Sequence, residues 1–288
     1  HCSVRRQRQM CIRDSRKFIT CPTLTRGFYT HIYYYLVEKL FRTYIILYMS
    51  IDCDKETLLI SDDKAFYTLE GEGEYVGMPS VFFRLSMCNL TCQGFASEDS
   101  PHGCDSYISW SVKNKMTFNE IFKYFEDHKL IDKLKERAIF KITGGEPMVQ
   151  QKQLLKFIEA FIDKYDFHPV IDFETNATIQ PDELWVSKYY ATFTTSPRLT
   201  SNGDPEERTY KPEVLKWHKE VGSGFKFVIN RSEDIDEIWK KYVEDGIVNV
   251  PLHRIWFMPC CGSRQEHVEK APAVAEYAKA MNLSLIHI

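Results

Sequence analysis

Short apolar runs alternate with longer segments of helical period along most of this chain. The runs are rich in β-branched and aromatic residues, which is typical of strands. They predict strands over Ser80–Met87, Ala138–Ile142, Pro169–Glu174, Tyr190–Thr195, Phe225–Ile229 and Arg254–Met258. Strands separated by helices imply parallel pairing and right-handed crossovers. The pattern therefore predicts an α/β fold, either a doubly wound sheet or an open, partial (βα) barrel.

The segments between these runs carry apolar residues at helical spacing. Helices are predicted over Thr117–Arg137, Gln150–Tyr165 and Arg264–Met281, with further helix starts at Pro212 and Ser232. The first helix begins with Thr117-Phe-Asn-Glu120, which fits a capping box. No composition break, linker or short repeat indicates a second domain.

The two ends of the chain do not share this pattern. Arg5–Ser15 and Leu283–Ile288 resemble translated sequencing adapters. Between Arg16 and Tyr48, charged residues interrupt the apolar sequence, so no uncharged run approaches the roughly 18–20 residues that span a membrane; an amphipathic surface helix is the alternative. We interpret residues 1–48 as non-native, residues 49–282 as one domain truncated at its C-terminus, and residues 283–288 as adapter-like.

The overall composition narrows the class of protein. Apolar residues make up 44% of the 288 residues and charged residues 27%, a mix typical of soluble globular proteins. The net charge of −3 argues against a strongly basic nucleic-acid surface. Nine cysteines, an odd number without disulfide-like spacing, indicate reduced thiols in a cytoplasmic protein. We therefore expect neither a nucleic-acid nor a membrane partner.

Polar residues gather where the predicted strands end. They are the cysteine loop after the first strand, Thr143-Gly144-Gly145-Glu146-Pro147 after the second, Glu174-Thr175-Asn176 after the third, Ser196-Pro197-Arg198 after the fourth and Pro259-Cys260-Cys261-Gly262 after the last. Each alone fits an ordinary turn. In a barrel, chemistry collects at the C-terminal ends of the strands. Their coincidence on one rim therefore predicts a functional site.

Three cysteines in the first of these loops, Cys88, Cys92 and Cys104, allow three interpretations. They could be buried as small hydrophobic residues, although the loop around them is polar. They could hold zinc with His102 as a fourth ligand, although His102 and Cys104 are only two residues apart, which makes tetrahedral coordination by both difficult. They could hold a [4Fe–4S] cluster that leaves one iron free for a small molecule. The spacing favours the cluster.

The cysteine loop and Gly144-Gly145-Glu146-Pro147 together resemble the radical S-adenosylmethionine superfamily. The resemblance implies a partial (βα)6 TIM-like barrel, a [4Fe–4S] cluster and S-adenosylmethionine as cofactor. In that superfamily the methionyl group chelates the open iron, and reductive cleavage gives a 5′-deoxyadenosyl radical. A glycine-rich strand end suits this, because bare backbone can approach the cofactor closely.

A finer resemblance is to the 7-carboxy-7-deazaguanine synthases. It rests on Phe66–Gly73 (FYTLEGEG), Gly77–Leu85, Cys88-Asn89-Leu90-Thr91-Cys92 and Cys104-Asp105-Ser106, and it extends to Gly262. It implies a lyase-type enzyme of queuosine and deazapurine synthesis that converts 6-carboxy-5,6,7,8-tetrahydropterin to 7-carboxy-7-deazaguanine with loss of ammonia. The radical would abstract hydrogen from the pterin, and the cofactor would be regenerated. An electron donor such as flavodoxin or ferredoxin and a homodimer are also implied.

The same resemblance implies the residues of the site. Cys88, Cys92 and Cys104 would bind the cluster, and Ser106 would bind Mg²⁺, with a helix N-cap as the alternative role for this hydroxyl. Cofactor contacts would come from Gly144, Gly145, Glu146, Glu174, Ser196, Pro197, Arg198, Met258, Pro259, Cys260 and Cys261. Substrate contacts would come from Leu69, Glu70, Gly71, Arg84 and Thr143. Arg84 would clamp the substrate carboxylate, or alternatively form a surface ion pair. No side chain is expected to be catalytic beyond the cluster and the cofactor.

Three departures from the family pattern stand out. Gln93–Gly103 is inserted before the third cysteine, Glu70 replaces the usual Gln, and Arg198 replaces the usual Lys. The nearest rival function is a radical activating enzyme for a glycyl-radical protein or an anaerobic nucleotide reductase. The others are a non-catalytic zinc-binding module and a degenerate scaffold without a cluster. The FYTLEGEG segment disfavours the first, and the ordered strand-end motifs disfavour the second.

Overall fold

The computed structural model describes residues 51–98, 100–244 and 246–286, all within one compact unit that begins at Ile51. The predictions for residues 1–48 lie outside these described residues. Among the residues that are described, no helix is long and apolar enough to cross a membrane.

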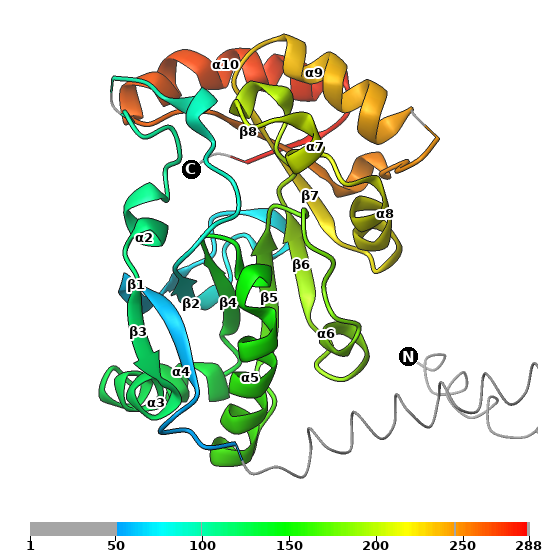
Figure 1. The fold of residues 1–288 in the computed structure, drawn as a ribbon. Coiled ribbons are helices and arrows are strands. Elements are labelled where there is room, and N and C mark those ends of the chain that lie inside the picture. Colours follow the sequence, from blue (N-terminus) through cyan, green and yellow to red (C-terminus); the bar gives the residue numbers. More distant parts are fainter. Residues whose placement is uncertain (1–50, 99, 245, 287–288) are drawn as a thin grey trace, which may run out of the picture. The chain divides into compact units, whose positions relative to one another are not determined.

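Nine strands form one mixed sheet (Figure 1) in the order β3-β1-β2-β4-β5-β6-β7-β8-β9. Their bounds are β1 Thr57–Leu69, β2 Pro79–Leu85, β3 Asn114–Thr117, β4 Ile139–Gly144, β5 Val170–Thr175, β6 Thr192–Thr195, β7 Gly224–Ile229, β8 Ile255–Pro259 and β9 Ser284–Leu285. Strands β2, β4, β5, β6, β7 and β8 are parallel, which confirms the six predicted strands and the α/β fold class. Within the described chain, the edge strands β3 and β9 do not pair with each other, so the sheet does not close into a barrel.

Three strands of the sheet were not predicted. Strand β1 runs antiparallel to both β2 and β3, and β9 adds to β8 at the other edge. The register of β1 shifts between Ile60 and Ala65, and Lys64 has a positive φ of 47°. This irregularity, together with the polar residues Asp62 and Asp63, breaks the period of two that identifies a strand.

The α-helices mostly follow the predicted starts. They are α2 Tyr107–Ser111, α3 Phe118–Asp127, α4 Leu130–Lys135, α5 Gln151–Tyr165, α6 Leu184–Ser187, α7 Glu206–Thr209, α8 Pro212–Glu220, α9 Glu233–Ile238 and α10 Arg264–Ala280. The capping box at Thr117 and Glu120 is confirmed. The single helix predicted over Thr117–Arg137 is wrong, because Lys129 adopts a left-handed conformation with φ of 56° and separates α3 from α4.

Apolar and polar residues alternate along the parallel strands, so one face of the sheet is apolar and the other is polar. In β2, Phe83 is fully buried among the aromatic side chains Phe125, Phe140 and Phe157, with ring centroids 5.4 to 5.9 Å away. These rings join β2 and β4 to α3 and α5, which cover this face (Figure 1). Burying each such side chain contributes about 1.5–3 kcal/mol. The helix-covered face therefore holds the sheet together.

The opposite face of the same strands carries charge. Lys141 in β4, Asp172 and Glu174 in β5, and Lys226 in β7 alternate with the buried apolar residues of those strands. Lys141 and Asp172 are direct neighbours in the parallel register. Successive side chains of a strand point to opposite faces, so one pattern of residues builds both the core and a charged inner surface.

The Gly144-Gly145 pair draws the ends of β2 and β4 together. Gly145 and Glu146 donate backbone hydrogen bonds to Leu85 and Met87, at 2.9 and 2.8 Å. A Cβ atom on Gly145 would lie 1.9 Å from the Met87 carbonyl oxygen, so no side chain fits. Gly144 also has a positive φ of 115°. The two glycines thus fix the point from which the cysteine loop departs.

Candidate active site

A cavity of about 480 Å³ opens where the parallel strands end. The residues that line it include Phe66, Glu72, Phe82, Arg84, Cys88, Cys92, Phe95, Cys104, Ser106, Trp110, Thr143, Glu174, Asn176, Arg198, Lys226, Met258 and Cys260. Its volume lies within the range of small-molecule sites. We call one end of the cavity the cysteine end (Cys88, Cys92, Cys104 and the polar groups that contact them). The other end borders what we call the charged network (Glu70, Glu72, Lys141, Asp172, Glu174 and Lys226), of which Glu72, Glu174 and Lys226 line the cavity.

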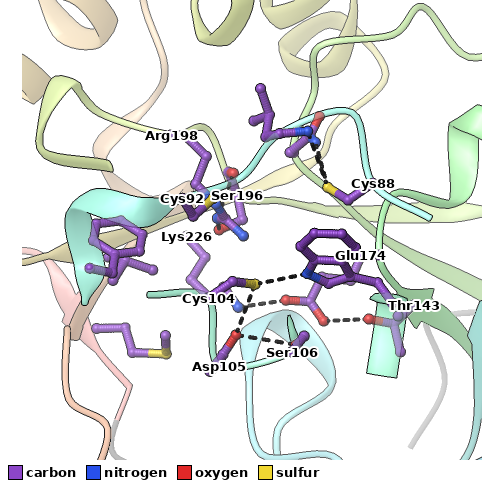
Figure 2. A pocket seen from close by; sticks show the side chains of 18 of the residues that line it. Cys88, Cys92, Cys104, Asp105, Ser106, Thr143, Glu174, Ser196, Arg198 and Lys226 are labelled. Carbon is purple, nitrogen blue, oxygen red and sulfur yellow. Dashed lines mark hydrogen bonds and ion pairs between the residues drawn. The ribbon is translucent and has the colours of Figure 1, made fainter. Parts of the chain in front are cut away.

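The cysteine end brings together the three cysteines of the predicted cluster loop (Figure 2). All are free thiols in the described structure. Burial raises the pKa of Cys88 to about 12, and burial together with Asp105 raises the pKa of Cys104. Both shifts favour the thiol over the thiolate in the protein alone, so an iron–sulfur group would have to supply the compensating positive charge.

Asp204 holds the cysteine loop in place. Its carboxylate accepts hydrogen bonds from the backbone N–H groups of Thr91 and Cys92, at 2.9 and 2.8 Å, and from the hydroxyl of Thr91 at 3.0 Å. Burial alone would raise the pKa of Asp204, but the backbone donors of Cys92 and Thr91 more than offset it and lower this pKa. The loop is therefore anchored to a segment more than 100 residues away in the sequence.

Arg198 supplies a positive charge next to the cysteines (Figure 2). Its Nη1 donates to the carbonyl and hydroxyl oxygens of Ser196, at 2.9 and 2.5 Å. Burial opposes its charge, but the neighbouring Cys92, Cys104 and Asp105 more than compensate and raise the pKa of Arg198. The Nε atom of Arg198 is buried without a hydrogen-bond partner. A cationic group with a spare buried donor beside three thiols fits an anionic cluster with a bound carboxylate.

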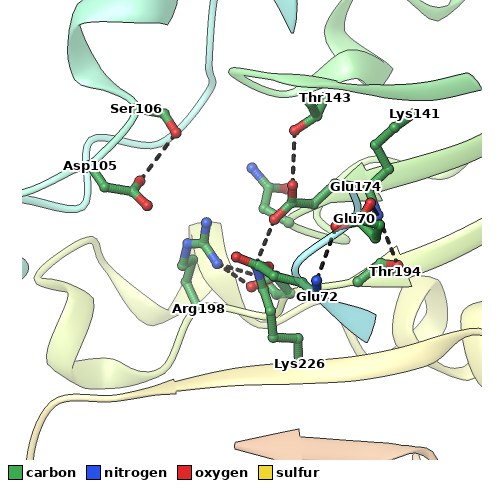
Figure 3. A network of polar contacts seen from close by, with 12 residues as sticks. Glu70, Glu72, Asp105, Ser106, Lys141, Thr143, Glu174, Thr194, Arg198 and Lys226 are labelled. Carbon is green, nitrogen blue, oxygen red and sulfur yellow. Dashed lines mark hydrogen bonds and ion pairs between the residues drawn. The ribbon is translucent and has the colours of Figure 1, made fainter. Parts of the chain in front are cut away.

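Lys226 joins two carboxylates in the charged network (Figure 3). Its ammonium contacts Glu72, and it lies 2.6 Å from Glu174. Glu174 also accepts a hydrogen bond of 2.9 Å from the hydroxyl of Thr143. Burial would raise the pKa of Glu174, but Lys226 and Lys141 outweigh it and hold this pKa well below its usual range. In Glu72, the effect of burial is larger than the attraction of Lys226, so the pKa of this carboxyl is raised.

Lys141 forms the second centre of the network, below the cavity. It is 1% exposed and lies 2.6 Å from Asp172 and 3.1 Å from Glu70. Its ammonium also donates to the hydroxyl of Thr194 at 3.3 Å. The other oxygen of Glu70 accepts from the backbone N–H of Glu72 at 3.0 Å. Glu70 thus links the two lysine centres through the FYTLEGEG segment.

Most of the predicted site residues line this cavity. Those that do are Cys88, Cys92, Cys104, Ser106, Arg84, Thr143, Gly144, Gly145, Glu174, Ser196, Arg198, Met258, Pro259, Cys260 and Cys261. Leu69, Glu70, Gly71, Glu146 and Pro197 do not. Leu69 is 62% exposed at the end of β1. Glu146 is fully buried and accepts bonds from the N–H groups of Met148 and Asn176, which ties β4 to β5.

Two predicted roles had explicit alternatives. Ser106 occupies the N-cap position of α2, but its hydroxyl makes no capping bond and instead contacts Asp105 at 3.2 Å (Figure 3). Arg84 lines the cavity and also forms an ion pair of 2.7 Å with Asp63. Both residues line the cavity, and the polar group of each contacts an aspartate.

Sequence reasoning did not assign several residues that the structure places at the site. Among them are Glu72, Asn176, Lys226 and Trp110. The alternation of Lys226 with buried phenylalanines in β7 was a usable signal for an inner-facing charge. Trp110 carried no signal of this kind. The inserted Gln93–Gly103 segment also contributes to the cavity wall, through Phe95, Ser100 and Gly103.

Comparison with known proteins agrees with the iron–sulfur interpretation. Residues 69–179 match a family model described as a 4Fe-4S single cluster domain. This match contains all three cysteines of the loop.

Among the residues described, no three His, Cys, Asp or Glu side chains converge closely enough to hold a single metal ion.

Curated relatives point to one enzyme family. A protein of Aquifex aeolicus named 7-carboxy-7-deazaguanine synthase is 31% identical over 222 residues, which cover 75% of this chain and 84% of the relative. One from Pyrobaculum aerophilum with the same name is 26% identical, covering 71% of this chain and 81% of the relative. One from Koribacter versatilis is 34% identical over 97 residues, covering 34% of this chain and 36% of the relative.

A solved structure shares the fold. The crystal structure of QueE from Escherichia coli aligns with a TM-score of 0.52 and 19% sequence identity, covering 83% of this chain and all of the other. At this identity the likeness concerns the fold.

Proposed function

Because this chain belongs to the 7-carboxy-7-deazaguanine synthase family, we propose that its cavity converts 6-carboxy-5,6,7,8-tetrahydropterin to 7-carboxy-7-deazaguanine with loss of ammonia. It is a radical S-adenosylmethionine enzyme of the lyase class, with a [4Fe–4S] cluster as cofactor. The radical activating enzyme and the zinc-binding module are not favoured by the relatives.

One observation carries this proposal. A single cavity has three cysteine thiols at one end and the Glu72 and Glu174 carboxylates with their shared Lys226 at the other. A cluster, a nucleoside cofactor and a polar heterocycle need these surroundings in this arrangement, because the radical must form next to the substrate it attacks.

The cysteine end would hold the cluster and the cofactor. Cys88, Cys92 and Cys104 would bind three irons, and the fourth iron would take the methionyl group of S-adenosylmethionine, whose reductive cleavage supplies the organic radical. Arg198 and Ser196 lie beside Cys92 and would bind the methionyl carboxylate through the unpartnered guanidinium donor. The Gly144-Gly145 backbone would face the amine.

The charged network would bind the pyrimidine edge of the pterin through hydrogen bonds. It contains four carboxylates, Glu70, Glu72, Asp172 and Glu174, and only two lysines, Lys141 and Lys226. Carboxylates accept hydrogen bonds and do not donate them, so the excess favours a ligand rich in N–H groups. The 2-amino-4-oxopyrimidine edge of a pterin has these donors. Glu72 and Glu174 line the cavity and would make these contacts, with Thr143 beside them.

Arg84 would bind the carboxylate of the substrate. It faces the cavity from β2, and its partner Asp63 is 40% exposed. An exposed ion pair contributes little, so exchange of Asp63 for a substrate carboxylate in the less solvated cavity is favourable.

Ser106 would provide an oxygen ligand to Mg²⁺ at the same mouth of the cavity. Its hydroxyl lies next to the Asp105 carboxylate. Hydroxyl and carboxylate oxygens suit this hard cation, which keeps most of its waters and bridges to ligand oxygens. We also expect an external one-electron donor such as flavodoxin or ferredoxin, and a homodimer.

The test is turnover under anaerobic conditions. Reconstituted protein, S-adenosylmethionine, dithionite, Mg²⁺ and 6-carboxy-5,6,7,8-tetrahydropterin should yield 7-carboxy-7-deazaguanine by mass spectrometry. Cleavage of S-adenosylmethionine without this product would retain the radical enzyme and exclude the substrate. Absence of both reactions in cluster-loaded protein would exclude the proposed function.

A further inference from the structure

Each of the three cysteine sulfurs faces a neutral side-chain N–H group from a different part of the chain, and Cys92 also has the Arg198 guanidinium beside it. Asn176 lies 3.9 Å from the sulfur of Cys88 through its Nδ2 atom. The Nδ2 atom of Asn202 lies 3.6 Å from the sulfur of Cys92. The indole nitrogen of Trp110 lies 3.4 Å from the sulfur of Cys104, the contact that Figure 2 draws as a dashed line.

The two amides are held in this orientation by other contacts. The Oδ1 atom of Asn176 accepts bonds from the N–H and hydroxyl of Thr178, at 3.0 and 2.6 Å, so its NH₂ group must point toward Cys88. The Oδ1 atom of Asn202 accepts from the N–H of Asp204 at 2.9 Å. Since an amide nitrogen has two hydrogens, each can bind an oxygen with one and face the sulfur with the other.

The amide nitrogens of Asn176 and Asn202 also bind oxygen atoms, which fixes their position beside the sulfurs. The Nδ2 atom of Asn202 also donates to the Asp204 carboxylate at 3.1 Å, the same group that anchors the backbone of Cys92. Trp110 has a single N–H, and indole nitrogen is a donor only. All three groups are neutral, so they can bind sulfur without adding charge.

We propose that Asn176, Asn202 and Trp110 set the reduction potential of the cluster bound by Cys88, Cys92 and Cys104. They act through the sulfur ligands as positioning residues. This inference rests on the proposed function, because it requires the cluster. N–H groups that bind the sulfurs stabilise the reduced cluster, which carries one more negative charge, and therefore raise its potential.

The arrangement has a consequence for the reaction. A higher potential lets a weak donor reduce the cluster, but it leaves less driving force for cleavage of S-adenosylmethionine. Three donors of unequal distance, from 3.4 to 3.9 Å, give a balance between these two demands. The shortest contact, from Trp110 to Cys104, is expected to contribute most.

Trp110→Phe tests the proposal most cleanly, because it removes the N–H and keeps an aromatic ring. The matched control is Trp217→Phe, the same change at a residue that packs against Phe193 and lies outside the cavity lining. Both proteins and the unsubstituted protein are reconstituted anaerobically, assayed for iron and sulfide, and titrated with dithionite against redox mediators. The one-electron midpoint potential is read from the electron paramagnetic resonance signal.

Trp110→Phe should lower the reduction equilibrium constant about tenfold, which is roughly 59 mV more negative for a one-electron couple. Trp217→Phe should match the unsubstituted protein. Trp110→Leu, which also lacks the indole N–H and brings no other donor, should shift the potential in the same direction.

Equal potentials in all the proteins would overturn the proposal. So would loss of iron in both Trp110 variants, because Trp110 would then be needed to retain the cluster. If the unsubstituted protein itself binds no cluster, the proposed function fails, and that outcome is distinct from a cluster whose potential does not respond.

Discussion

The cysteine end and the charged network meet at one cavity but are built differently. The cysteines lie on a loop that is held by hydrogen bonds from distant turns, including the Asp204 carboxylate. Most side chains of the charged network lie on β4, β5 and β7, which the strand register brings together, and Glu70 and Glu72 join them from the segment that follows β1. A loop can lengthen at little entropic cost, whereas a strand cannot change register without moving every side chain to the other face.

The departures that the family resemblance implies differ between the two ends, apart from the substitution at Arg198 in the cysteine end. The inserted Gln93–Gly103 segment lies at the cysteine end and forms part of the cavity wall through Phe95 and Ser100. The charged network has instead exchanged one side chain, Glu70, within a fixed frame. Mutations should therefore affect cofactor binding at one end and folding stability at the other.

The largest effect is expected at the cysteine end. Cys104→Ala should reduce cleavage of S-adenosylmethionine to background, because one iron loses its protein ligand. Iron content and 5′-deoxyadenosine formation are the measurements. Cys260→Ala and Cys261→Ala are matched controls on the same cavity and should leave cleavage measurable. The reverse pattern would assign the third ligand to Cys260 or Cys261.

Lys226→Met should have the largest effect on stability. It leaves the partly buried Glu72 and Glu174 next to each other without the buried lysine that they share, and breaking a buried ion pair costs about 3–5 kcal/mol. The free energy of unfolding, from urea titration, is the measurement. Lys216→Met, at an exposed position of α8, is the control. A loss below about 1 kcal/mol would show that the network does not stabilise the fold.

The same variant should change how stability depends on pH. In the unsubstituted protein, the lysines hold the pKa of Glu174 below its unfolded value. Its contribution to stability is therefore present above about pH 4.3 and is lost as the pH falls toward the folded pKa. Without Lys226 both carboxyls should titrate above their unfolded values.

A carboxyl with a raised folded pKa binds more protons in the folded protein, so stability falls as the pH rises through that range. The gap between Lys226→Met and the unsubstituted protein should consequently shrink between pH 7.5 and pH 5. Urea titrations at both values measure it. A gap that stays constant over this range would mean that Glu72 and Glu174 stay ionised without the lysine.

A smaller effect is expected at Glu70. Its two oxygens face the ammonium of Lys141 and the N–H of Glu72, which are both donors. Glu70→Gln offers one acceptor oxygen to these two donors, so it should cost about 1–3 kcal/mol. Thermal or urea unfolding measures this. Glu74→Gln, on the neighbouring exposed turn, should be neutral. Equal stability of Glu70→Gln would mean that the carboxylate charge is not used.

Much of this site could be predicted from the sequence, since strand ends and cysteine spacing are local patterns. The six predicted strands are present and parallel, and Cys88, Cys92 and Cys104 line one cavity. The alternation of charged and apolar residues in β4, β5 and β7 is a further local signal, of an inner charged face, that the sequence analysis did not use.

Other features depend on contacts that no local pattern reveals. Strand β1 was missed because its irregular register hides the period of two. Leu69 and Gly71 were expected at the substrate but lie outside the cavity lining, while Glu72 in the same motif lines it. Asn202 reaches the sulfur of Cys92 across 110 positions of sequence. A hydrogen bond of this kind is set by tertiary packing alone.

The most direct test of the account is the electron paramagnetic resonance spectrum of the reduced, reconstituted protein with and without S-adenosylmethionine. We expect about four iron and four sulfide per chain, and a spectrum that changes when S-adenosylmethionine is added, because one iron is open to it. The account is contradicted if the protein takes up no iron–sulfur cluster, or if a fully loaded cluster gives the same spectrum in both conditions.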